Sequence, residues 1–169
     1  MKRHILILTA IAMLAACKPH SHEGENAEAT HEGHDHSMEA PEGAIIQELK
    51  EGQRVFFANL KDGDIITTPY TVEFGVEGMT VAPAGEIVED QGHHHLLINH
   101  GFIPAGEVIP AGDSTKLHFG KGQTATEVNL PPGDYTFTMQ FANGAHMSFG
   151  EQMSTSIKVS VEAPAKHMR

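Results

Sequence analysis

The stretch Asp134-Tyr135-Thr136-Phe137-Thr138-Met139-Gln140-Phe141-Ala142 alternates large apolar and polar side chains without a break. Successive side chains of a β-strand point to opposite faces of a sheet, whereas an amphipathic helix needs apolar residues three or four apart. The pattern therefore predicts a strand with one buried and one exposed face. The residues expected to face inwards are Tyr135, Phe137, Met139 and Phe141, and those expected to face outwards are Thr136, Thr138 and Gln140.

The residues on either side of this stretch form turns. Asn143-Gly144, which follows it, is a typical signal for a tight hairpin. Leu130-Pro131-Pro132-Gly133-Asp134-Tyr135, which leads into it, resembles the tyrosine corner of immunoglobulin-like domains. In that corner the tyrosine hydroxyl hydrogen-bonds back to the backbone a few residues upstream. The resemblance implies a β-sandwich.

Other short segments of the chain have strand character and are separated by Gly, Pro, Asn and Asp. They cover residues 54–58, 71–77, 94–98, 116–119, 124–130 and 156–161. Residues 44–50 are expected to form a helical turn or a short strand, and residues 104–112 a loop that could carry one. No long segment has helical periodicity. The predicted fold is all-β, an immunoglobulin-like antiparallel β-sandwich of about seven strands over residues 53–162.

The first seventeen residues have the order of a bacterial lipoprotein signal, with basic Lys2 and Arg3 before an apolar run too short to span a bilayer. Leu14-Ala15-Ala16-Cys17 then resembles the lipobox, whose cysteine is lipidated after cleavage. A secretory signal with a chance cysteine is the alternative, but Cys17 is the only cysteine in the chain. We expect a lipid anchor at Cys17 on the periplasmic face of the bacterial envelope. Lys18 favours the outer membrane, by resemblance to Gram-negative sorting.

Residues 18–52 have almost no large apolar side chain until residue 45 and are predicted to be a disordered, histidine-rich tether. His31, His34, His36 and Met38 within it are expected to form a second, weaker metal site, although a solvated linker has the same composition. Residues 163–169 are assigned to a C-terminal tail. The formal net charge of -11 makes nucleic acid an unexpected partner.

The most unusual stretch is Gly92-His93-His94-His95-Leu96-Leu97-Ile98-Asn99-His100, in a chain with 13 histidines. On a strand, His93 and His95 share one face, and His94 shares the other with Leu96 and Ile98. Two imidazoles at a fixed spacing are suited to zinc, copper, nickel or iron. The plainer interpretation is that they are polar residues at a strand start, each hydrogen-bonded locally. Three in succession favour the metal.

We expect His93 and His95 to be metal ligands, joined by His118 and by His146 or Met147, and His94 to pack in the core or support a ligand. His100 and Met153 are further candidates. Thioethers select soft metals such as Cu(I), so the His146-Met147 pair favours copper, with zinc as the alternative.

Much of the chain, from about residue 55 to residue 161, resembles an uncharacterised bacterial family, domain-of-unknown-function family 4399. The resemblance implies no settled activity and supports grouping His93, His94, His95 and His118. The segment 145–148 follows the family pattern only loosely. The matching motifs are Phe74-Gly75-Val76-Glu77-Gly78-Met79, Pro83-Ala84-Gly85, residues 92–98, residues 118–124 and Pro132-Gly133.

The predicted function is that of a periplasm-facing lipoprotein that binds a transition metal for delivery or tolerance. The protein is not expected to be an enzyme, because the chain has no HExxH, nucleophile elbow or phosphate loop. A zinc-dependent hydrolase, with Glu86, Glu89 or Asp90 as general base, is one alternative. An envelope interaction module with structural histidines is another, and the sequence names no protein partner.

Overall fold

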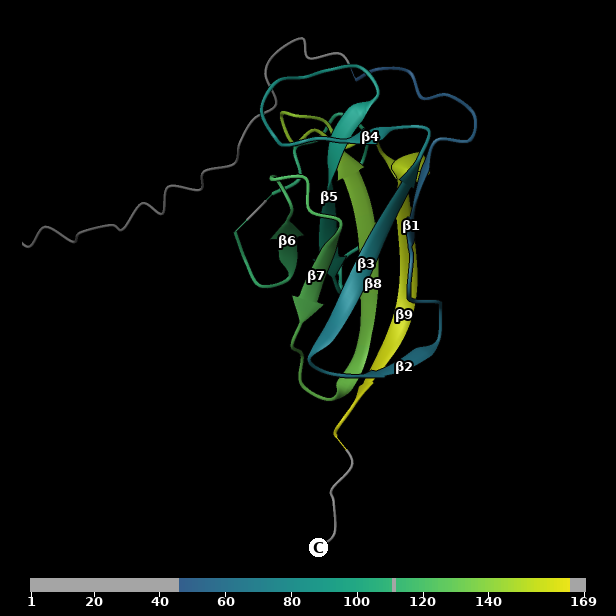
Figure 1. Ribbon diagram of the computed structural model, residues 1–169, viewed down its shortest axis with the longest axis vertical. Helices are drawn as coiled ribbons and strands as arrows, with labels where there is room; N and C mark the ends of the chain where they lie inside the picture. Colours follow the sequence, from purple (N-terminus) through teal and green to yellow (C-terminus); the bar gives the residue numbers. More distant parts are fainter. Residues whose placement is uncertain (1–45, 111, 165–169) are drawn as a thin grey trace, which may run out of the picture. The chain divides into compact units, whose positions relative to one another are not determined.

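The computed structural model describes residues 46–110 and 112–164. These residues lie in one of the two units into which the chain divides, His36–Arg169, and the other unit, Met1–Asp35, is outside the described part. The described residues form nine strands, which Figure 1 labels. The elements are β1 Arg54–Phe57, β2 Asp64–Thr67, β3 Tyr70–Glu77, β4 Thr80–Val81, β5 Gln91–Ile98, β6 Lys116–His118, β7 Ala125–Val128, β8 Gly133–Ala142, the 3-10 turn η1 Glu151–Met153 and β9 Ser154–Glu162.

The strands form two sheets that pack face to face, and the predicted all-β sandwich is confirmed. One sheet has the order β1-β3-β7, and the other has the order β2-β9-β8-β5-β4, with β6 also paired to β5. In Figure 1 the small sheet crosses in front of β8. The prediction was an antiparallel sandwich, whereas the larger sheet is mixed: β2 runs parallel to β9, and β4 runs parallel to β5. The short β2 and β4 were not predicted.

Strand β8 lies in the middle of the larger sheet, between β5 and β9. Its inward residues Phe137, Met139 and Phe141 are completely buried and pack against the small sheet, where Val72 and Phe74 come from β3. The predicted facing of this strand is therefore correct for its apolar residues. Burial of this much apolar and aromatic surface is the main source of stability in a domain of this size.

The predicted tyrosine corner is present. The Tyr135 hydroxyl donates a hydrogen bond to the Pro131 carbonyl over 2.9 Å, across the bend that leads into β8. This bond ties the first residues of the central strand to the bend that precedes them.

The outer face of β8 differs from the prediction, because Thr138 and Gln140 are completely buried. The segment that follows β5 covers them and forms no strand, only an isolated bridge at Val108. The Gln140 amide accepts from Ile103 N over 2.7 Å and donates to Ile103 O over 2.7 Å, and Thr138 Oγ1 donates to the His100 carbonyl. Alternating polar residues identify the face correctly, but side-chain hydrogen bonds to a loop allow that face to be buried.

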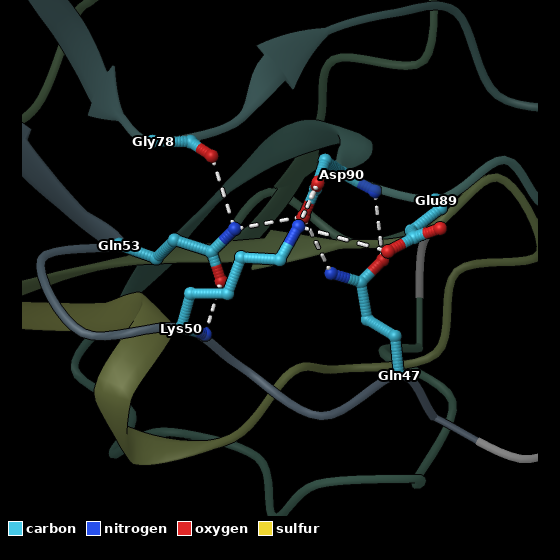
Figure 2. Close-up of polar contacts among 6 residues, drawn as sticks. All are labelled: Gln47, Lys50, Gln53, Gly78, Glu89 and Asp90. Atoms are coloured by element: carbon cyan, nitrogen blue, oxygen red, sulfur yellow. Dashed lines mark hydrogen bonds and ion pairs between the residues drawn. The ribbon is translucent and has the colours of Figure 1, made fainter.

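Residues 46–52, which the sequence assigns to the tether, pack against the sandwich without forming a helix or strand. Figure 2 shows the polar contacts that hold them. Gln47 pairs with Asp90 twice, through its amide nitrogen to Oδ1 and its oxygen to the backbone N–H. Gln53 and Lys50 bind the same carboxylate, and the Lys50 contact, together with these amides, lowers the pKa of Asp90. The folded domain thus begins earlier than predicted.

Candidate metal centre

Strand β5 carries the histidine triplet through the interior of the larger sheet. One of its edges pairs with β8 along its length, and the other pairs with β4 near Gly92 and with β6 near Leu96. Both faces are covered, so all residues from Gly92 to Ile98 are buried. A glycine at 92 is required by packing, because a Cβ there would lie 2.3 Å from the Ala142 carbonyl oxygen.

His93 and His95 point from the same face of β5, as their spacing predicts. Their Nε2 atoms are 3.0 Å apart. His118 comes from β6, where the register places it directly opposite His95, and its ring centroid lies 5.0 Å from those of both His93 and His95. One ligand nitrogen from each of these three residues lies within 4.8 Å of the others. The prediction that a strand at 116–119 carries His118 is confirmed.

His146 completes the group from the turn that follows β8. Its Nε2 lies 3.1 Å from Nε2 of His118, and its ring centroid is 5.0 Å from that of His93. Of the other three histidines, His95 lies farthest from His146, with ring centroids 6.1 Å apart. The structure thus brings four predicted ligands together, and we call His93, His95, His118 and His146 the imidazole cluster.

The spacing of the nitrogens in the cluster is compatible with a shared ion. Ligand nitrogens at ~2.0 Å from a metal are about 3.3 Å apart in a tetrahedron and about 2.8 Å apart at a right angle. The two closest Nε2 pairs, at 3.0 and 3.1 Å, lie between these values. Each of these pairs could thus share one ion, and a nitrogen of His118 lies within 4.8 Å of one from each member of the buried pair.

The cluster has a buried side and an open side. His93 and His95 are completely buried, His146 is half-buried and His118 is exposed. The exposed ring of His118 packs closely against Gly120, where an added Cβ would lie 2.3 and 2.4 Å from the Cε1 and Nε2 atoms of the ring. An ion could therefore exchange with solvent through the side of His118 and His146 while the buried pair stays fixed.

The inner imidazoles are neutral at physiological pH, which is the ligating form. Burial, with repulsion from the neighbouring imidazoles, lowers the pKa of His93 to about 3 and that of His95 to about 2. Burial and the His146 charge also lower the pKa of His118. Among the described residues, Nδ1 of His93 has no hydrogen-bond partner, so the only polar contact of that ring is to another imidazole.

His94 occupies the opposite face of β5, as predicted, in an aromatic pocket of the core. Its ring centroid is 5.0 Å from that of Phe141 and 5.4 Å from that of Phe74. Neither ring nitrogen meets a hydrogen-bond partner in the described part of the chain, and burial lowers its pKa to about 4. His94 therefore packs in the core, and its ring makes no hydrogen bond that could support a ligand.

The remaining candidates are distributed differently. Met147 and Met153 are completely buried, and Met153 belongs to the main core. His100 contacts Thr115 Oγ1 over 3.0 Å, away from the cluster. The proposed bases Asp90 and Glu89 are engaged with Lys50. The predicted tail ligands His31, His34, His36 and Met38 and the predicted lipidation site Cys17 lie outside the described residues.

Sequence reasoning did not identify the residues that support the ligands. Gly120 lies in the turn that follows β6, so no strand periodicity indicates that its missing side chain leaves room for the His118 ring. Asn143 was interpreted only as a turn former, but its side chain organises the loop that carries His146.

Comparison with known proteins places the domain in a family and gives it no activity. No curated protein matches the chain. No solved structure matches it either. Residues 72–162, which include the whole imidazole cluster, match the model of a family described as a domain of unknown function, DUF4399. This match spans more than half of the chain, and the protein therefore belongs to the DUF4399 family.

Proposed function

We propose that this protein binds a transition-metal ion through the imidazoles of the cluster. The observation that carries the proposal is the pair of Nε2 contacts His93–His95 and His118–His146, 3.0 and 3.1 Å long, with one nitrogen each of His93, His95 and His118 within 4.8 Å of the others. Imidazole is the commonest metal ligand in proteins when it is neutral. A ring that is buried and neutral needs no deprotonation before it binds.

The plainer interpretation, that these histidines bond locally at a strand start, has little support from the contacts. The rings of His93 and His95 meet each other and other imidazoles, rather than neighbouring backbone groups. Burying polar atoms without partners costs about 1–3 kcal/mol for each group. Nδ1 of His93 bears that cost, whereas the Nε2 atoms meet only other imidazoles among the described residues, and a cation shared by the Nε2 atoms would be a stronger partner for them.

Copper is the favoured ion and zinc the alternative. Four imidazoles suit either, and the intrinsic order of affinities places Cu(II) above Zn(II) for a given nitrogen site. Met147 directly follows His146 in the chain, and a thioether ligand from it would select Cu(I). We propose that the ion is carried for delivery or tolerance.

The proposed setting is the bacterial envelope, with Cys17 lipidated and the domain facing the periplasm. This proposal rests on the order of residues 1–17. In the described residues, no helix has the length and apolar character needed to cross a bilayer.

A hydrolase is the weaker candidate. The group of possible ligands in the described residues contains only histidines. Asp90, one of the candidate bases, is held by Gln47, Gln53 and Lys50. A base committed to three partners is poorly placed to accept a proton from water.

Metal content of the protein from its own periplasm tests the proposal. The protein should be purified without an immobilised-metal resin, in a variant whose tail residues His20, His22, His31, His34, His36 and Met38 are alanine. We call this the tail variant. About one copper or zinc per chain is expected. His93→Ala should lose it, and His100→Ala, a half-buried histidine outside the cluster, should keep it. A tail variant without metal, even after incubation with copper or zinc, would contradict the proposal.

A further inference from the structure

His146 is held in a backbone conformation that residues other than glycine rarely adopt. Its φ is 66°, in the left-handed region. There the Cβ crowds the following carbonyl, so the conformation costs free energy and persists only where the surroundings impose it. Glycine would occupy this position without strain. A histidine there indicates that its side chain has a task.

The group that imposes this conformation is Asn143, at the start of the same turn. Its side-chain oxygen accepts hydrogen bonds from the backbone N–H groups of Ala145 and Met147, each over 3.0 Å. Its backbone carbonyl accepts from His146 N, and its backbone N–H donates to the Met147 carbonyl, also over 3.0 Å. Asn143 is only 2% exposed. The residues on both sides of His146 are thus tied to one buried side chain.

Two further contacts hold the turn from outside. Ile109 N donates to the His146 carbonyl over 2.9 Å. Gly144 lies against the loop between β4 and β5. Gly85 N of that loop donates to the Gly144 carbonyl, and a Cβ added to Gly144 would lie 2.0 Å from the Glu86 carbonyl oxygen. The turn is therefore a rigid support, and its only strained non-glycine residue carries the half-buried imidazole of the cluster.

We propose that Asn143 is a positioning residue for metal binding: it holds His146 in its left-handed conformation so that Nε2 meets His118 at the open side of the cluster. This inference rests on the proposed metal site and adds the reason why its outer side is formed in advance. Ordering a ligand before the ion arrives avoids an entropic cost at binding, so preorganisation increases affinity.

A double-mutant cycle in the tail variant tests this role, with Cu(II) as the probe and dissociation constants measured by competition with a chelator. Asn143→Ala and His146→Ala should each weaken binding, by about 10- to 100-fold, as is typical for loss of a supporting partner of a ligand. Because Asn143 acts through His146, the double variant should be no weaker than His146→Ala alone. The Cu(II) EPR spectrum of Asn143→Ala should show the same loss of one nitrogen as that of His146→Ala.

Graded substitutions separate positioning from plain folding. Asn143→Asp keeps the oxygen that accepts both bonds and should retain wild-type affinity or better, whereas Asn143→Ser forms the same turn more weakly and should fall between Asp and Ala. Asn99→Ala is the matched control. Asn99 also has a positive φ, of 61°, and its side-chain oxygen accepts from Thr136 N at the other end of β5. It should leave copper affinity unchanged.

Several outcomes would overturn the inference. Unchanged affinity in Asn143→Ala, beside a loss in His146→Ala, would remove the role of Asn143 and leave the metal site intact. If the fold-loss of copper affinity in the double variant equals the product of the two single losses, the two residues act independently. If Asn143→Ala does not fold, equal losses in the Asp and Ser variants would contradict the positioning role. Unchanged copper binding in both His93→Ala and His146→Ala would overturn this inference together with the proposed function.

Discussion

Strand β5 places histidines on both of its faces, and their surroundings differ. On one face His93 and His95 meet two further imidazoles, with Nε2 atoms 3.0 Å apart. On the other face His94 lies between Phe74 and Phe141. All three are completely buried, and burial lowers the pKa of each. Burial therefore does not distinguish a ligand from a packed side chain, but the convergence of nitrogens does.

Among the described residues, Nδ1 of His93 lacks a hydrogen-bond partner on the cluster face, and both ring nitrogens of His94 lack one on the aromatic face. A buried imidazole without partners loses its hydration in either place. On the cluster face a cation can engage the nitrogens, whereas on the aromatic face no described group does. Because burial lowers the pKa of all three histidines, the two faces should respond alike to acid in the metal-free protein and differently when an ion is present.

The largest effect is expected from acid, on the metal-free protein. His93, His94 and His95 have a pKa near 6.5 when unfolded and values of about 3, 4 and 2 when folded. Below pH 6.5 the unfolded chain therefore binds protons that the folded chain does not, and stability falls as pH drops toward about 4. Each histidine contributes about 1.4 kcal/mol per pH unit in this window and nothing above it.

Urea unfolding at pH 7, 6 and 5 in the presence of a chelator measures the acid effect. His94→Leu and His95→Leu should each reduce the slope of the free energy of unfolding against pH by about a third. A slope that is the same in both variants and in the parent would show that the imidazoles are not buried in solution as they are in this structure.

The next largest effect is expected from removal of the Phe141 ring, which packs beside His94. Phe141 is completely buried and contacts both His94 and Phe149, so Phe141→Ala should cost about 3–5 kcal/mol. Since Phe141 lies on the aromatic face, the folded variant should keep its metal affinity. Chemical denaturation and a copper titration of the same sample check both parts. A variant that stays folded and loses metal would mean that the two faces are coupled.

Much of this comparison could be predicted from the sequence. Alternation in β8 and β5 gave the correct facing of Phe137, His93 and His94, and the motif around Tyr135 predicted its corner. The meeting of His118 with His95 depends on strand register, which alternation does not determine. The strain at His146 and the burial of Gln140 depend on loops whose hydrogen bonds come from distant residues, so no local pattern indicates them.

A smaller effect separates the faces through stability. His94→Leu removes two nitrogens without partners and should raise the free energy of unfolding by about 1 kcal/mol, with and without metal. His95→Leu leaves Nε2 of His93 without its partner, so it should not stabilise the metal-free protein, and it should also forfeit the stabilisation by copper, which is about 2.7 kcal/mol when the free ion is at 100 times its Kd. Thermal melts with chelator and with copper compare the two. Destabilisation of metal-free His94→Leu would contradict the stated cost of burial.

The smallest effect concerns the open side of the cluster. Gly120→Ala places a methyl group where the His118 ring lies and should push this exposed ring aside. Copper affinity should fall by about 10-fold, while stability changes little. Gly101→Ala is the matched control, because nothing lies within 4 Å of an added Cβ there. Equal affinities in the two variants would remove His118 from the set of ligands.

The most direct measurement of the central claim compares two neighbours in the chain. His94→Ala and His95→Ala, each in the tail variant, differ in which face of β5 loses its imidazole. Chelator competition with Cu(II) should show a loss of affinity of at least about 100-fold for His95→Ala, which removes a ligand outright, and a change within a few-fold for His94→Ala. Equal losses in both variants, or a loss in His94→Ala alone, would contradict the assignment of metal binding to the cluster face.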